Sequence, residues 1–449
     1  MKTFILGSYK MTEIKTYDDA LNFIHGRFKA RKIPTLARMR ELLKRLGNPQ
    51  NGQSYIHVTG TNGKGSTVTM IRAMLMASGY QVGTFTSPFI TRFNERIALN
   101  GQPISDRDLV IYTRQVATVV DQMDAEGQTP TEFEINTAIM FLYFADRKPD
   151  VVILEVGIGG LYDSTNVIEK PDVAVIVTVG YDHMQFLGDS LTEIATIKAG
   201  IIKKHSPVVV GQLPAEAKQV IVSTAKKKQS PLFQLGQEFH AQAKNSHQLA
   251  QKIEYQGLSL AKTVFQLGLA GDYQVQNAGV AITTVQLWLQ KHQGYLDPSN
   301  IAEGLLNAHW PGRMEIVNRE PLMILDGAHN LPGVQALVQT IEHELADREV
   351  YLLVAILADK QYELMLGELA SLRNVHLVLT QFSPPGPKRP TADLAGLKDL
   401  IRTRYPMQVF PEWQLGLAAI SQQVSAEDVI LITGSLYFIS EVRNFLLAD

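Results

Sequence analysis

The chain has 449 residues, of which 45% are hydrophobic and 19% are charged, and its formal net charge is −2 at pH 7. This length accommodates more than one domain with its own core, and the composition is not that of a disordered protein. The nearly balanced charge excludes a broad nucleic-acid surface, so we expect small partners held by local donors. The chain contains no cysteine, which excludes disulfides and thiolate metal sites.

No membrane partner is expected from the sequence. No apolar run approaches the roughly 18 residues that a transmembrane helix needs. The start MKTFILGSYKMTEIK contains too short an apolar run for a signal peptide. We therefore expect a cytoplasmic protein, and we expect it to be a monomer.

Short apolar runs rich in β-branched residues alternate with amphipathic stretches, a pattern typical of parallel sheets covered by helices. The runs are apolar throughout, as strands buried on both faces are. A break containing Pro311 and Gly312 separates two series of runs. We therefore predict two α/β domains that join near residues 308–312. The first series lies at 55–60, 151–157, 173–180 and 206–211, and the second at 322–327, 350–357, 375–380 and 428–434.

The stretch HVTGTNGKGST, residues 57–67, follows the first predicted strand and precedes a predicted helix. Its spacing differs from the usual phosphate-loop signature, but the strand–loop–helix context is the one that a phosphate cradle requires. Glycines let backbone N–H groups turn inward, Lys64 can reach phosphates, and Ser66 offers a hydroxyl to Mg²⁺. The alternative is a glycine-rich turn with a solvated lysine. We predict nucleotide contacts from Gly60, Thr61, Asn62, Gly63, Lys64, Gly65 and Ser66.

Polar residues follow other predicted strands. Glu155 ends DVVILE, the pair Asp182-His183 follows VIVTVGY, and Ser87 follows VGTFT. Each has an ordinary alternative, such as a surface carboxylate, a helix cap or a turn histidine. Because carboxyl ends of strands in an open parallel sheet meet at one crevice, we expect these side chains to lie beside Lys64.

These stretches resemble folylpolyglutamate synthase, a member of the Mur ligase superfamily. The resemblance is carried, from about Leu36 to Tyr437, by the loop at 57–67 and by TSPFITRFNERI, EVGIGGLYDSTNV, DHMQFLG, IKAGIIK, GDYQVQNA, HWPGRMEIV, LDGAHN and TGSLYF. It implies a P-loop-type ATPase domain with a mostly parallel sheet over residues 1–308. It also implies a smaller Rossmann-like α/β domain of the glutamate-ligase type over 309–449.

The resemblance implies a set of site residues. Ser66, Ser87, Glu155 and His183 would bind Mg²⁺, and Asn277, Arg313 and Asp326 would complete the ATP site. His329 would help to form the site of the incoming L-glutamate. A strand end followed by a helix cap at Asn330 is an ordinary alternative for this last stretch. Lys64, His183, Lys198 and His329 are the residues expected to take part in catalysis.

The implied reaction adds L-glutamate to the γ-carboxyl of a folate or folylpolyglutamate through an acyl phosphate, with release of ADP and phosphate. The resemblance further implies that Lys198 carries a carbamate that binds metal. The alternative for Lys198 is a surface lysine on an amphipathic helix. The spacing of Ile194, Ile197 and Ile201 predicts a packed helix that directs Lys198 towards His183.

Other functions stay open at this point. A dihydrofolate synthase that uses dihydropteroate, and a ligase that builds cell-wall peptides, are the alternatives within the superfamily. The helix predicted at 131–148 would line the folate pocket without revealing which pterin it accepts. A catalytically silent binding protein is a third alternative. A regulatory GTPase is disfavoured because the chain contains no N-K-x-D tetrapeptide.

Overall fold

The computed structural model describes residues 13–28, 35–244, 249, 251–383, 390–393, 396 and 401–447. The start of the chain at 1–12 and most of the proline-rich loop SPPGPKRP, which we expect at the surface, lie outside these ranges. We call the residues up to Ala308 the first domain and those from His309 the second domain, in line with the predicted division. Within the described ranges, no helix has both the length and the apolar character needed to cross a bilayer.

The first domain is built on an eight-stranded sheet in the order β4-β3-β2-β5-β1-β6-β7-β8. The strands from β2 to β8 in this order run parallel, while β3 and β4 form an antiparallel edge. The strands are β1 (Tyr55–Thr59), β2 (Val82–Phe85), β3 (Ile97–Leu99), β4 (Gln102–Pro103), β5 (Val151–Glu155), β6 (Val173–Ile176), β7 (Val208–Val210) and β8 (Leu232–Gln234).

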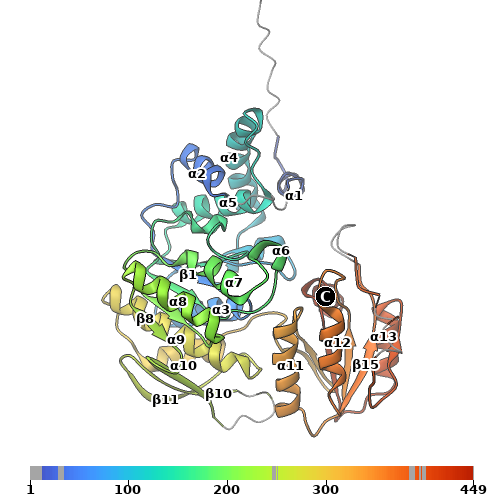
Figure 1. Ribbon diagram of the computed structural model, residues 1–449. Helices are drawn as coiled ribbons and strands as arrows, with labels where there is room; N and C mark the ends of the chain where they lie inside the picture. Colours follow the sequence, from blue (N-terminus) through green and yellow to red (C-terminus); the bar gives the residue numbers. More distant parts are fainter. Residues whose placement is uncertain are drawn as a thin grey trace, which may run out of the picture.

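Helices cover both faces of this sheet. A core beneath β1 joins α3 to α9 and α10, and a second core joins α1, α2, α4 and α5. Figure 1 shows this second group above the sheet. The helices are α1 (Tyr17–His25), α2 (Ala37–Arg45), α3 (Lys64–Ala77), α4 (Asp106–Ala125), α5 (Glu132–Arg147), α6 (Met184–Leu187), α7 (Leu191–Lys198), α8 (Ala215–Lys228), α9 (Tyr273–Lys291) and α10 (Pro298–Asn307), with 3₁₀ turns at Phe93–Arg96, Ser164–Val167 and Ala199–Ile201.

A three-stranded antiparallel sheet, which was not predicted, packs against α9. It consists of β9 (Phe239–Ala243), β10 (Lys252–Gly257) and β11 (Leu260–Gln266). Its strands are only partly buried, and in β10 the buried residues alternate: they are Ile253, Tyr255 and Gly257. This alternation is the mark of a sheet with one solvated face, unlike the continuous apolar runs of the main sheet.

The second domain has a six-stranded sheet in the order β12-β13-β17-β14-β15-β16, parallel except for β12. Figure 1 shows this domain, orange to red, beside the first, with α11 on the side that faces it. Its elements are β12 (Glu315–Arg319), β13 (Leu322–Leu325), α11 (Leu331–Glu344), β14 (Val350–Val354), α12 (Tyr362–Ala370), β15 (Val375–Leu379), β16 (Gln408–Val409), α13 (Trp413–Ser421), β17 (Val429–Thr433) and α14 (Leu436–Leu446).

The predicted fold class is confirmed, because both main sheets are mostly parallel and all eight predicted strands are present. Strand ends differ in detail. The run predicted at 173–180 is a strand only to Ile176, since the chain then turns to join the loop after β1 through Thr178. Ile201 is also not part of the helix of Lys198, because α7 ends at Lys198 and a 3₁₀ turn follows.

Candidate active site

A cavity of about 880 Å³ lies between the two domains at the carboxyl ends of both main sheets. The loops after β2, β5, β1 and β6 enter it from the first domain, where these strands are neighbours. Every residue predicted for the site lines this one cavity. These residues are Gly60, Thr61, Asn62, Gly63, Lys64, Gly65, Ser66, Ser87, Glu155, His183, Lys198, Asn277, Arg313, Asp326 and His329.

The glycine loop after β1 is held in a conformation that only glycine adopts easily. Gly63 has a φ of 81°, and a Cβ there would lie 2.4 Å from Oδ1 of Asn277. The helix α3 begins at Lys64, one residue later. The Nζ atom of Lys64 donates to the carbonyl oxygens of Gly60 at 2.9 Å and Thr61 at 3.2 Å. The loop therefore combines a helix N-terminus with a cation beside it, which suits an anionic ligand.

The first turn of α9 supports this loop from the side. Gln274 donates from Nε2 to Oγ of Ser66 at 3.2 Å, and Asn277 donates from Nδ2 to Oε1 of Gln274 at 2.9 Å. All three side chains are buried. Asn277, which was predicted, thus lies behind the loop together with Gln274, which was not.

Glu155 is a buried carboxylate at the end of β5, with 3% of its surface exposed. Its Oε2 accepts from the backbone N–H of Ser87 at 3.2 Å. Burial raises the pKa of Glu155 to about 7, although the charge of Lys64 partly opposes this. A cation close to the carboxylate would stabilise its charged form.

The described residues contain no cluster of three or more carboxylate, imidazole or thiol side chains able to hold a metal. Mg²⁺ does not require such a cluster, because it commonly binds one or two protein carboxylates and completes its coordination shell with water and phosphate oxygens. Glu155 and the hydroxyls of Ser66 and Ser87 therefore fit this ion in chemical type.

The raised pKa of Glu155 predicts a pH dependence of stability. The folded pKa is about 7 and lies above the ordinary value of 4.5. The folded protein therefore binds the proton more tightly, and stability should fall as pH rises through this window. We expect the unfolding free energy of the ligand-free protein, relative to Glu155→Gln, to fall by about 1–3 kcal/mol. Urea unfolding at pH 5 and 7.5 measures this difference, and parallel pH profiles would contradict it.

Lys198 is the last residue of α7 and has 2% of its surface exposed. The loop after β5 packs on this helix end, where the N–H of Leu161 donates to the carbonyl of Ile197 at 2.8 Å. Burial, with the charge of Lys64, lowers the pKa of Lys198 to about 7. The expectation that Lys198 lies in a packed helix and faces the cavity is confirmed, and the surface-lysine alternative is wrong.

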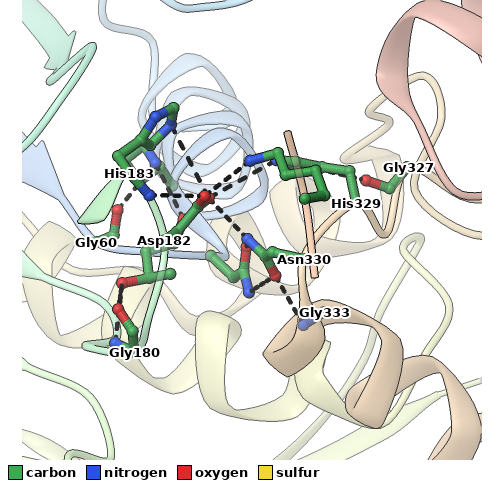
Figure 2. Close-up of polar contacts among 12 residues, drawn as sticks. Gly60, Gly180, Asp182, His183, Gly327, His329, Asn330 and Gly333 are labelled. Atoms are coloured by element: carbon green, nitrogen blue, oxygen red, sulfur yellow. Dashed lines mark hydrogen bonds and ion pairs between the residues drawn. The ribbon is translucent and has the colours of Figure 1, made fainter. Parts of the chain in front are cut away.

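Asp182 is the centre of a contact between the domains (Figure 2). Its Oδ1 accepts from Nζ of Lys360 at 2.8 Å, and its Oδ2 accepts from Nδ2 of Asn330 at 2.9 Å. His183 and His329 lie on either side of it, each with Nε2 about 4 Å from Oδ2. Burial disfavours the charged carboxylate, but the charge of His183, which is protonated at the acid pH where Asp182 titrates, and the charge of Lys360 outweigh it and lower the pKa of Asp182. The alternative in which Asp182 only caps a helix is wrong.

The environment of His183 and His329 favours the neutral form of both imidazole rings. Burial lowers the pKa of His329 to about 4, and the charge of Lys360 adds to this effect. The pKa of His183 is lowered in the same direction by partial desolvation, but to a smaller extent, because its side chain is 40% exposed. Nδ1 of His329 lies 2.8 Å from the carbonyl oxygen of Gly327 and therefore carries the proton. His183 has a φ of 51° and precedes α6 directly.

Asp326 follows β13 and is buried, with 3% exposed. Its Oδ2 accepts from the hydroxyl of Tyr273 at 3.1 Å and from the N–H of Met314 at 3.0 Å. Burial raises its pKa, while the charge of Arg313 opposes this shift. Asp326 therefore ties α9 of the first domain to Met314 and the end of β13 in the second domain. The predicted helix cap is also confirmed, because Asn330 precedes α11 and accepts from the N–H of Gly333.

Lys360, Tyr273 and Gln274 line or support the cavity but were not predicted. Lys360 follows β14, so the rule that polar groups at strand ends converge would have found it. Tyr273 and Gln274 lie in the stretch GDYQVQNA. No spacing signal identifies them, since their partners are far away in sequence.

Two family models match the chain. The Mur ligase middle domain matches residues 58–285, and the glutamate ligase domain of Mur ligases matches residues 312–436. Together they include the glycine loop, the end of β5 and the stretch around Asp326.

Similar proteins agree with these matches. The dihydrofolate synthase/folylpolyglutamate synthase of Bacillus subtilis is 38% identical, covering 96% of this chain and 99% of its own. The folylpolyglutamate synthase of Lacticaseibacillus casei is 39% identical over the same shares.

Solved structures show the same likeness. A complex of folylpolyglutamate synthase with AMPPCP and folate superposes with a TM-score of 0.84 at 37% identity, covering 96% of this chain and 100% of the other. The Mycobacterium tuberculosis folylpolyglutamate synthase, solved with ADP and AMPPCP, gives 0.85 at 28% identity and covers 96% and 98%. With its fold, its glycine loop and its two matched domains, the chain belongs to the folylpolyglutamate synthase family of Mur ligases.

Proposed function

We propose that this protein is an ATP-dependent ligase that adds L-glutamate to the γ-carboxyl of folate and its polyglutamates. The observation that carries the proposal is the single cavity in which a glycine loop with Lys64 faces residues of the second domain. Relatives of nearly full-length similarity are named folylpolyglutamate synthase, and one solved relative holds AMPPCP and folate together.

The loop after β1 would bind the nucleotide phosphates, and Glu155 with Ser66, Ser87 and His183 would hold Mg²⁺. When bound, ATP with Mg²⁺ supplies the phosphoryl group that converts the acceptor carboxylate into an acyl phosphate. Lys64 offsets negative charge at the phosphates as the group is transferred. The N-terminus of α3, two residues from Ser66, adds its partial positive charge on the same side.

The second domain would supply the site for the incoming glutamate. Lys360 and His329 reach the cavity from this domain, and an ammonium is a suitable partner for a carboxylate. The glutamate amine attacks the activated carbonyl, phosphate leaves, and an amide forms without a covalent enzyme intermediate. Contacts of Asp182 and Asn62 with the second domain keep this region closed, which protects an acyl phosphate from water.

Asp326→Ala tests whether the second domain contributes to nucleotide binding. The change removes the acceptor of Tyr273 and Met314, so α9 loses its hydrogen-bonded connection to the start of the second domain. We expect the KM for ATP to rise about tenfold, in line with the loss of charged hydrogen bonds, while the first domain stays folded. Steady-state kinetics measures the KM, and a thermal melt tests whether the protein is folded. An unchanged affinity for ATP would show that Asp326 does not support the nucleotide site.

We also propose that Lys198 carries a carbamate. A lysine with a pKa of about 7 is largely neutral at slightly alkaline pH. Its nitrogen can attack CO₂, forming an N–C bond and losing a proton, and the product is an anion. This anion would face the same part of the cavity as His183 and could bind a cation or its water ligands.

Lys198→Ala should then lose about 10²-fold or more in turnover, and short carboxylic acids should restore part of it, because they replace the missing anion. Glutamate incorporation with and without added acetate or propionate measures the rescue. Lys203→Ala is the control, because Lys203 is a half-buried lysine that lies outside the cavity. Full activity of Lys198→Ala, or a loss without rescue, would argue against the carbamate.

A second activity, dihydrofolate synthase, is favoured by the Bacillus subtilis relative, whose name includes both functions. Assaying labelled glutamate with tetrahydrofolate and with dihydropteroate separates the two. We expect incorporation with tetrahydrofolate, and incorporation with dihydropteroate would add the second activity. Turnover with dihydropteroate alone, or only with a UDP-sugar peptide, would overturn the proposal.

A further inference from the structure

The helix α11 runs from the contact around Asp182 to a second contact between the domains, of which one residue, Asp272, also lines the cavity. At its start, Asn330 and Asn62 exchange hydrogen bonds of 2.9 and 3.1 Å through their side-chain amides. At its other end lie Thr340, His343 and Glu344. The helix has 14 residues, so its two ends are about 20 Å apart.

The remote end of α11 bonds to the first domain through four side chains, which we call the distal contact: Gln251, Asp272, His343 and Glu344. Nε2 of Gln251 donates to Oδ1 of Asp272 at 3.3 Å and to Oε1 of Glu344 at 3.2 Å. Nδ1 of His343 lies 2.6 Å from Oδ2 of Asp272. The amide of Gln251 thus bridges a carboxylate of each domain.

Apolar packing reinforces the distal contact. Leu249 and Ala270 of the first domain belong to the hydrophobic core of the second, together with Leu337 and Ile341 of α11. The N–H of Asp272 also donates to Oγ1 of Thr340 at 3.4 Å. A helix attached at two separated points fixes the orientation of its domain better than one attached at a single point.

The distal contact is continuous with the nucleotide side of the cavity. Asp272 directly precedes α9, whose first residue, Tyr273, donates to Asp326. The next residue, Gln274, donates to Ser66 of the glycine loop. A shift at Asp272 would therefore move groups that hold both the loop and the start of the second domain.

The four side chains do not contribute equally. His343 is 66% exposed, and ion pairs of exposed side chains contribute little because water screens them. Gln251 has no exposed surface, and a buried amide between two carboxylates is costly to lose. Gln251 is therefore the residue on which the distal contact depends most.

We propose that the distal contact positions the second domain for catalysis, with Gln251 and Glu344 as positioning residues that never touch substrate. This inference rests on the proposed ligase function. A weaker distal contact lowers the fraction of molecules in which the two domains are closed over the cavity. The apparent affinity of a ligand that binds only these molecules falls in proportion to that fraction. Saturating ligand restores closure, so KM should change more than kcat.

The kinetic test uses Gln251→Met, which keeps the side-chain volume but removes the donor. We expect the KM values for ATP and glutamate to rise about three- to tenfold and kcat to stay within about twofold, because binding to a fractionally populated state scales with that fraction. His343→Gln should change KM less than about twofold. If Gln251→Met does not fold, Glu344→Leu removes the acceptor from the other domain and carries the same expectation.

The matched control is His376→Gln. Like His343, His376 pairs with a carboxylate: its Nε2 lies 2.8 Å from Oε2 of Glu349. Unlike the pair of His343 and Asp272, this pair lies within the second domain. We expect wild-type constants for this variant. Unchanged KM in folded Gln251→Met and Glu344→Leu, a fall in kcat at constant KM, or the same effect in His376→Gln would overturn the inference.

A distance measurement tests the inference without any activity readout. The chain has no cysteine, so cysteines placed at the exposed Lys226 of α8 and Glu363 of α12 can be labelled specifically for energy transfer. We expect a broader distance distribution for ligand-free Gln251→Met than for the labelled wild type and His376→Gln. Identical distributions would contradict positioning by the distal contact. Absence of folate-dependent ligation in the wild type would instead contradict the proposed function and leave this distance result standing.

Discussion

Replacing Lys64 with alanine is expected to reduce glutamate ligation by about 10³-fold, a loss typical of removing a preorganised charge that faces developing negative charge. The glycine loop GTNGKGST contains no second cation. Nζ of Lys64 is held over the loop by the carbonyls of Gly60 and Thr61. The fold should survive, because alanine is favourable at the first residue of α3.

The measurement is the rate of labelled glutamate incorporation at saturating ATP, with circular dichroism as the test of folding. Lys203→Ala is the matched control, since Lys203 is half-buried and its Nζ donates to the carbonyl of Asn166 at 3.4 Å, away from the cavity. Retention of more than about a tenth of wild-type activity in Lys64→Ala would exclude Lys64 from the role that we assign to it.

Glu155→Gln is expected to lower activity by about 10²-fold at a fixed Mg²⁺ concentration, as expected when a charged group that faces the reaction centre is lost. Glutamine has nearly the same shape and can still accept from the N–H of Ser87. Glutamine lacks the negative charge of Glu155. The pKa of about 7 indicates that burial disfavours this charge unless a cation lies close to it. The variant should therefore need more Mg²⁺ for half-maximal activity.

Titrating Mg²⁺ in the ligation assay measures this effect. Asp172→Asn is a suitable control, because Asp172 is also a buried carboxylate of the same sheet but precedes β6 at the opposite ends of the strands. An unchanged Mg²⁺ dependence in Glu155→Gln, with the protein folded, would remove Glu155 from the metal site.

The part of the site that lies in the first domain was largely predictable from sequence, for a physical reason. The loop at 60–66, Glu155 and His183 all follow continuous apolar runs, and parallel strands place such residues at one edge. The residues of the second domain were assigned through the resemblance to a known family. Their positions on the cavity then appear in the structure.

The contacts between the domains could not be read from sequence patterns. Lys360 and Asp182 are separated by 178 residues, and Asn62 and Asn330 by 268. Such pairs depend on how the two domains are oriented, which local periodicity does not encode. The sheet β9–β11 was missed for a different reason, since its strands are half-exposed and lack the continuous apolar runs of the main sheets.

The most direct test of the proposed activity is the coupling of ADP release to amide formation. Purified protein is incubated with ATP, Mg²⁺, tetrahydrofolate and labelled L-glutamate, and ADP, phosphate and labelled folate are counted together. We predict equal amounts of all three products, and only background ADP when either folate or glutamate is left out. ADP released at the same rate without glutamate and folate, or none under any of these conditions, would contradict the assignment of this protein as a folate–glutamate ligase.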